Sequence, residues 1–173
     1  MTGKSFVTLA MTLVFVCAVS GMPYAADMSG AWKGLLSSAD GSQAEVQIDF
    51  SPQGFPLYSY TNNKGLTRQV ELSHVGQTVE YVPSGGGVQR TVVTRVEKGP
   101  GRLTVGISGS FERASQGYLD QQQETALFEY ALVSDGLKLR ITTHTASHFG
   151  DKDMMVGGDP NAVVAEGILH RLR

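Results

Sequence analysis

Cysteine is almost missing from this sequence, because Cys17 is the only one among its 173 residues. A single cysteine forms no internal disulfide, so the fold does not depend on a disulfide framework. It also supplies no thiolate zinc site, which takes several ligands of this kind. The stability of the chain therefore has to come from a packed hydrophobic core.

A strong excess of charge of either sign is also missing. The chain has 14 Lys and Arg against 16 Asp and Glu, which gives a formal net charge of −2. It has no basic run interleaved with aromatic residues, the usual footprint of a nucleic-acid-binding surface. We therefore expect no nucleic-acid partner. Beyond the N-terminal stretch there is no long apolar run, so we expect no membrane span in the mature protein.

The one apolar run lies at the N-terminus. Lys4 precedes it, residues 6–19 are mostly apolar, and Ala25 and Ala26 follow it. A positive start, an apolar middle and small residues at the end are the three parts of a secretory signal peptide. We predict that residues 1–26 are a cleaved signal peptide and that the mature protein is periplasmic or secreted. The alternatives are a retained N-terminal anchor, or a lipid attached to the lone cysteine.

Residues 27–173 contain almost no helical period. They carry short stretches in which apolar and polar residues alternate, as at Val46, Ile48 and Phe50, with turn-forming residues between the stretches. Evenly spaced short strands of this kind are typical of a β-sandwich or a β-barrel. We predict that residues 27–173 form a single all-β domain, an antiparallel meander of about ten strands. Ser110–Gln123 is polar, and we predict an irregular segment there.

A meander of this size either closes into a barrel or folds into a sandwich. Closure removes the exposed strand edges that invite aggregation. The first and the last stretches of the domain are both apolar enough to pair with each other. These features favour a closed up-and-down barrel, with a sandwich as the alternative.

The predicted domain opens with Gly30-Ala31-Trp32. This Gly-x-Trp pattern resembles the first strand of lipocalin-like (calycin) barrels, in which the tryptophan plugs one end and a basic residue from a late strand packs across its ring. The resemblance implies that Gly30 and Trp32 have these structural roles, with Arg171 or Arg173 as the basic partner. The chain lacks the Thr-Asp-Tyr loop and the trailing helix of true lipocalins, so the likeness concerns architecture.

Two arginines stand within otherwise apolar patterns. Arg68 shares a predicted strand face with Val70, and Arg90 shares one with Val92. An arginine that points into an apolar interior needs a partner, and its planar fork suits a carboxylate or a phosphate. Arg68 and Arg90 are therefore candidate ligand-binding residues. Alternatively, the strand register places them outside, or an internal glutamate pairs with them.

Four aromatic residues are candidates for the lining of a pocket: Tyr58, Tyr60, Phe128 and Tyr130. Their rings offer apolar surface, and the tyrosines add a polar tip. The alternative is ordinary packing in the core and between neighbouring strands.

No residue is assigned to a metal, a cofactor or a catalytic step. Residues 147–159 hold His148 and three aspartates, but their spacing does not match the EF-hand calcium loop. Met154 and Met155 in the same loop are candidates for a lid over an apolar ligand. The sequence shows neither a nucleophile elbow nor a zinc-protease helix pattern, and enzymatic activity is left open.

These patterns favour an exported protein of lipocalin-like type that binds a small apolar or amphipathic ligand, including an anionic amphipathic one. The alternative is a non-catalytic accessory or interaction protein of the bacterial envelope. An internal cavity of a few hundred Å³ would favour ligand binding. A packed interior with an exposed apolar patch would favour the accessory protein.

Overall fold

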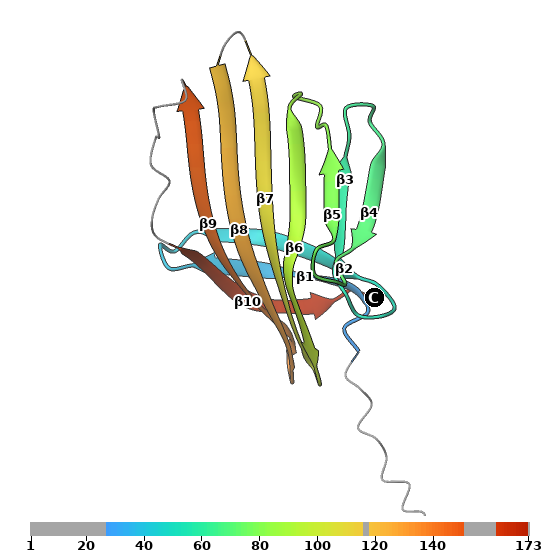
Figure 1. Ribbon diagram of the computed structural model, residues 1–173. Helices are drawn as coiled ribbons and strands as arrows, with labels where there is room; N and C mark the ends of the chain where they lie inside the picture. Colours follow the sequence, from blue (N-terminus) through green and yellow to red (C-terminus); the bar gives the residue numbers. More distant parts are fainter. Residues whose placement is uncertain (1–26, 116–117, 151–161, 173) are drawn as a thin grey trace, which may run out of the picture.

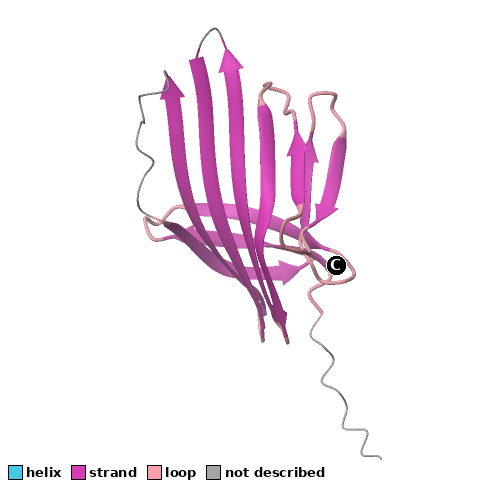
Figure 2. Ribbon diagram, in the orientation of Figure 1, coloured by secondary structure: helices cyan, strands magenta, loops and turns pink. Residues whose placement is uncertain are grey.

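The computed structural model describes residues 27–115, 118–150 and 162–172. Every regular element in these ranges is a β-strand (Figure 1, Figure 2), so the predicted all-β class is confirmed. The predicted signal peptide, residues 1–26, lies outside the described residues. No helix in the described ranges has the length and apolar character of a membrane span. The strands in chain order are β1 (Gly30–Ser38), β2 (Gln43–Phe50), β3 (Leu57–Thr61), β4 (Thr67–Glu71), β5 (Thr78–Tyr81), β6 (Val88–Gly99), β7 (Arg102–Ser115), β8 (Tyr118–Val133), β9 (Gly136–Gly150) and β10 (Val163–Arg171).

The described strands form an antiparallel meander, as predicted. Eight of them make one sheet in the order β2-β1-β10-β9-β8-β7-β6-β5, and β3 and β4 form a separate two-stranded sheet. Pairing is antiparallel throughout. The first and the last strands pair with each other, with Trp32 opposite Arg171. The C-terminal strand thus lies inside the sheet, between β1 and β9.

The sheet is not closed into the predicted barrel. β2 and β5 are its two edges, and the β3–β4 hairpin touches both. At the β2 edge the contact is a single bridge between Phe50 and Pro56. Near the end of β5, the N–H of Asn63 donates to the carbonyl oxygen of Val82 at 2.7 Å. Pro56 has no N–H to donate to a longer ladder. The hairpin therefore contacts both edges of the large sheet but does not pair along them.

A sharp bend separates the two parts of the large sheet. In Figure 1, β1, β2 and β10 run across the lower ends of the long strands β6–β9. The close approach of β1 and β10 depends on glycine. A Cβ atom on Gly167 would overlap the carbonyl oxygen of Leu35, and one on Gly34 would overlap that of Ile168. Glycine inside a strand typically marks such a tight corner.

The hydrophobic core lies on the inner side of this bend. Trp32 and Leu36 from β1 pack there with side chains from most of the other strands. Burying each large aliphatic side chain contributes about 1.5–3 kcal/mol, so this cluster is the main source of stability. The largest fully buried side chains are Leu103, Leu137, Leu139, Leu169, Val93 and Val105. These side chains come from β6, β7, β9 and β10, so the core cluster joins both parts of the bent sheet.

The long strands correct one prediction. Ser110–Gln123 is not irregular, because β7 continues to Ser115 and β8 begins at Tyr118. These polar stretches pair with each other residue by residue up to the pair Ser115 and Tyr118. Their positions lie beyond the core, where neither face of the sheet requires apolar side chains. The strands therefore pair here although the sequence lacks the alternation of apolar and polar residues that would indicate them.

A β-bulge in β6 decides which side chains face the core. The register between β6 and β7 shifts between Val93 and Arg95. Val93 is buried, and Val96 packs against the same core although the two are an odd number of residues apart. An extra residue in a bulge reverses the alternation in this way. Arg90 lies before the bulge, three residues from Val93. Its side chain therefore points to the opposite face of β6, where it is exposed.

Candidate functional site

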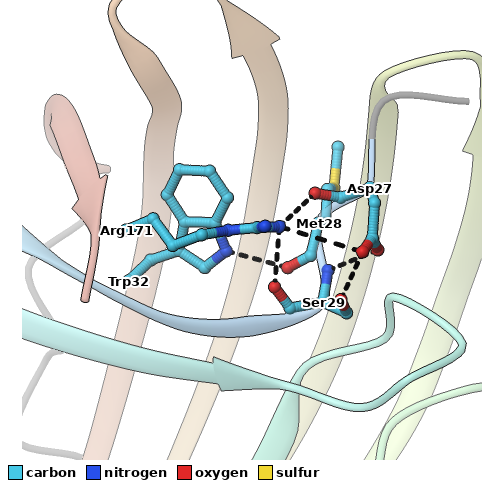
Figure 3. Close-up of polar contacts among 5 residues, drawn as sticks. All are labelled: Asp27, Met28, Ser29, Trp32 and Arg171. Atoms are coloured by element: carbon cyan, nitrogen blue, oxygen red, sulfur yellow. Dashed lines mark hydrogen bonds and ion pairs between the residues drawn. The ribbon is translucent and has the colours of Figure 1, made fainter. Parts of the chain in front are cut away.

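The first cluster of polar contacts surrounds Trp32 at the start of β1 (Figure 3). The indole is buried, and its Nε1 donates to the carbonyl oxygen of Met28 at 2.8 Å. Arg171 of β10 lies over the ring, with its guanidinium carbon 5.0 Å from the ring centroid. This distance is within the range of a cation–π contact. The guanidinium of Arg171 therefore covers one face of the buried indole.

Arg171 also fastens the residues that precede β1. Its Nη2 donates to the carbonyl oxygens of Asp27 at 2.6 Å and Ser29 at 2.9 Å. Asp27 in turn accepts hydrogen bonds from the side chain and the backbone N–H of Ser29, at 2.5 and 2.8 Å. These bonds, together with the nearby charges of Arg171 and Lys98, lower the pKa of Asp27 below its usual value. The cluster is structural, since every polar group named here is used within it.

A second cluster lies where the β3–β4 hairpin meets the edge strand β5. A hollow of about 220 Å³ opens there, and we call it the tyrosine hollow. The hairpin contributes an aromatic ring, two amides and an arginine, and β5 with the residue after it contributes the opposite wall. The lining residues are Tyr60, Asn62, Asn63, Arg68, Glu80, Tyr81 and Val82.

Three tyrosine side chains form a cluster between the core and this hollow, and we call it the tyrosine cluster. Tyr58 packs against the core cluster, and its ring lies 6.2 Å from that of Tyr60. Tyr60 in turn stacks on Tyr81, with 4.6 Å between the ring centroids and 28° between the planes. Burial, a hydrogen bond with Tyr58 and the nearby phenols raise the pKa of Tyr81 to about 12. The Tyr81 phenol is therefore neutral at physiological pH.

Arg68 provides the positive charge at the hollow. It lies opposite Tyr60 in the β3–β4 ladder and is exposed. Within the described residues no carboxylate forms an ion pair with Arg68. Glu80 is the one carboxylate that lines the hollow, and its cross-strand neighbour on β6 is Arg90. The guanidinium of Arg68 is thus free to bind an anion.

The structure brings together three of the six predicted ligand-binding residues: Tyr58, Tyr60 and Arg68 contribute to the tyrosine cluster and the hollow. Tyr130 is instead buried in the core, edge-on to Phe50 at 5.2 Å, and Phe128 stacks beside it. Burial raises the pKa of Tyr130. Arg90 sits on the other face of β6 from the core, as the strand-register alternative allows.

Tyr81 and the two asparagines were not predicted as site residues. Tyr81 lies two residues after Val79 in a short strand, and Val79 is buried. The alternation of a strand alone would therefore place Tyr81 on the core-facing side. The sequence carried no signal for its contact with Tyr60, because the two tyrosines come from different sheets. Asn62 and Asn63 belong to the hairpin turn, where asparagine is common for conformational reasons.

Two other depressions are less suited to binding. One of about 290 Å³ lies beside the β6–β7 turn, where Lys98 already donates to the carbonyl oxygen of Gln53 and covers the Phe55 ring at 4.4 Å. The other, of about 240 Å³, is lined by threonines, His144 and Gly106. His148 is not in the predicted loop but near the end of β9, and its side chain and the residues around Met154 lie outside the described part of the protein. Among the described side chains no group of three metal-binding residues gathers.

Comparison with known proteins adds no name to this geometry. No protein-family model matches the chain, and neither a curated protein nor a solved structure does.

Proposed function

We propose that this protein is an exported binding protein for a small amphipathic ligand, and that the tyrosine hollow holds the ligand's anionic end. The proposal includes the periplasmic or secreted location and the lipocalin-like barrel architecture expected from the sequence. The contact between Arg171 and Trp32 supports the architecture, since it is the arrangement that the resemblance implies. The β3–β4 hairpin, which touches both edges of the sheet, would complete the barrel wall.

The observation that carries the proposal is Arg68 beside the stacked rings of Tyr60 and Tyr81. A tyrosine ring provides apolar surface, and its hydroxyl provides a polar group. A guanidinium binds carboxylate or phosphate in a planar, charge-assisted geometry. A ligand with an apolar body and a negative group satisfies both. An interior cavity is not needed for this mode of binding.

The dimensions of the site limit how the ligand binds. Pockets that enclose a drug-sized ligand measure about 300–1,000 Å³, whereas the tyrosine hollow measures about 220 Å³. The hollow therefore takes one end of a larger ligand or the whole of a very small one.

The role of Arg68 in anion binding is tested by titration of the protein with decanoate and with benzoate, two anions that differ in their apolar part. We expect at least one of them to bind, and Arg68→Gln to weaken that binding about tenfold or more, because a charged hydrogen bond is lost. Isothermal titration calorimetry measures the dissociation constants. Arg140→Gln is the matched control, since Arg140 is also exposed but lies on β9, outside the hollow. Equal affinities of the two variants would refute the proposal, as would the absence of binding by both anions.

The alternative function, an accessory protein that docks onto another protein, has one observation in its favour. Along most of its length β2 pairs with β1 on one side only, among the described residues. Such an edge offers backbone groups to an added strand. This alternative predicts that neither anion binds in the titration above.

A further inference from the structure

The aromatic rings at the hollow suggest what the ligand's apolar part is. Tyr58 does not line the hollow, whereas Tyr60 and Tyr81 both do. These two rings stack with 4.6 Å between their centroids and 28° between their planes. A further aromatic ring bound in the hollow would add the offset stacking that such rings prefer.

The size of the hollow suits one ring. An apolar cavity of about 150 Å³ is enough to hold benzene. At about 220 Å³, the tyrosine hollow has room for one ring with a small substituent. An alkyl chain would extend out of the hollow after a few carbons.

Two sets of unused donors determine the substituent. Within the described residues, neither the guanidinium of Arg68 nor the side-chain amide of Asn63 has a hydrogen-bond partner. Both line the hollow. Arg68 presents a planar fork that matches a carboxylate. Glu80 also lines the hollow, so a doubly charged group such as a phosphate meets more repulsion there than a singly charged carboxylate.

From these constraints we infer that the ligand class is the single-ring aromatic carboxylic acids. The ring of the acid stacks against Tyr81 in the hollow, and the carboxylate accepts hydrogen bonds from Arg68 and Asn63. This inference rests on the proposed function and narrows it. Other amphipathic anions would bind more weakly at the same place.

Four small probes separate the contributions of ring and charge. They are benzoate, cyclohexanecarboxylate (same charge without an aromatic ring), benzyl alcohol (same ring without charge) and decanoate. We expect benzoate to bind about three- to tenfold more tightly than cyclohexanecarboxylate, which is the range of aromatic pairing. Benzyl alcohol should bind more weakly than benzoate. In proton NMR spectra the benzoate ring resonances should shift upfield, because the ring lies against another aromatic face.

Two substitutions at one position test the stacking directly. Tyr81→Phe keeps the ring and should keep the preference for benzoate, whereas Tyr81→Leu should abolish it. The comparison of benzoate with cyclohexanecarboxylate on the unmodified protein needs no variant, so it stands even if Tyr81→Leu does not fold. Equal affinity for these two acids, or an unchanged preference in folded Tyr81→Leu, would overturn the inference. Arg68-dependent binding of decanoate alone would overturn it and leave the proposed function intact, and no binding of any anion would overturn both.

Discussion

Replacement of Trp32 by alanine is expected to lower the free energy of unfolding by about 3–5 kcal/mol, the cost of removing a large buried aromatic side chain. The indole is buried in the core cluster and carries the Arg171 contact on its face. Its loss opens a cavity and leaves the carbonyl oxygen of Met28 without its donor. A loss of this size lowers Tm by about 10 °C or more in a domain of this length. Urea denaturation followed by circular dichroism measures it.

Trp32→Phe is the matched control for this substitution. It keeps an aromatic ring for Arg171 but loses the Nε1 donor and part of the volume, so it should cost clearly less than alanine. If Trp32→Ala left the unfolding midpoint unchanged, Trp32 would not be a core residue and the packing at this end of the sheet would be wrong.

Replacement of Gly167 by alanine should be nearly as damaging, with a cost of about 3 kcal/mol from overpacking. The added Cβ would overlap the carbonyl oxygen of Leu35 and lie 3.1 Å from a methyl carbon of Leu36. The Leu35 oxygen belongs to the backbone of β1, so relief requires β1 and β10 to move apart. Differential scanning calorimetry of the variant against the parent protein measures the loss.

Gly99→Ala supplies the control, because Gly99 also lies in a strand, at the end of β6, and a Cβ there meets nothing within 4 Å. It should be close to neutral. A Gly167→Ala variant as stable as Gly99→Ala would contradict the close approach of β1 to its neighbour β10.

Local alternation made the fold class predictable from the sequence. Val46, Ile48 and Phe50 alternate as expected of a strand with one buried face, and all three belong to the core or pack against it. Closure was not predictable in this way, because it depends on the edges of the sheet meeting. Pro56 interrupts one edge, and the short strand β5 forms the other. The bulge after Val93 was equally hidden, since one extra residue leaves no mark on composition.

The candidate site was predictable only in part, for a related reason. Tyr58, Tyr60 and Arg68 belong to one hairpin, so their shared face follows from the spacing and register of neighbouring strands. Tyr81 reaches the same place from another sheet, and only the tertiary structure brings it there. Tyr130 has the same alternating pattern as Tyr60 but lies on a central strand, so it is buried. Alternation identifies a face and does not tell whether that face is covered.

The central claim is that an amphipathic anion binds at the tyrosine hollow, and an NMR titration of isotope-labelled protein tests it most directly. With benzoate or decanoate as the titrant, we predict that the backbone amide shifts change most around Tyr60, Arg68 and Tyr81. The turn at Lys98–Arg102, which flanks the larger depression, should change little. Shift changes concentrated at that turn, or no changes at all, would contradict the claim.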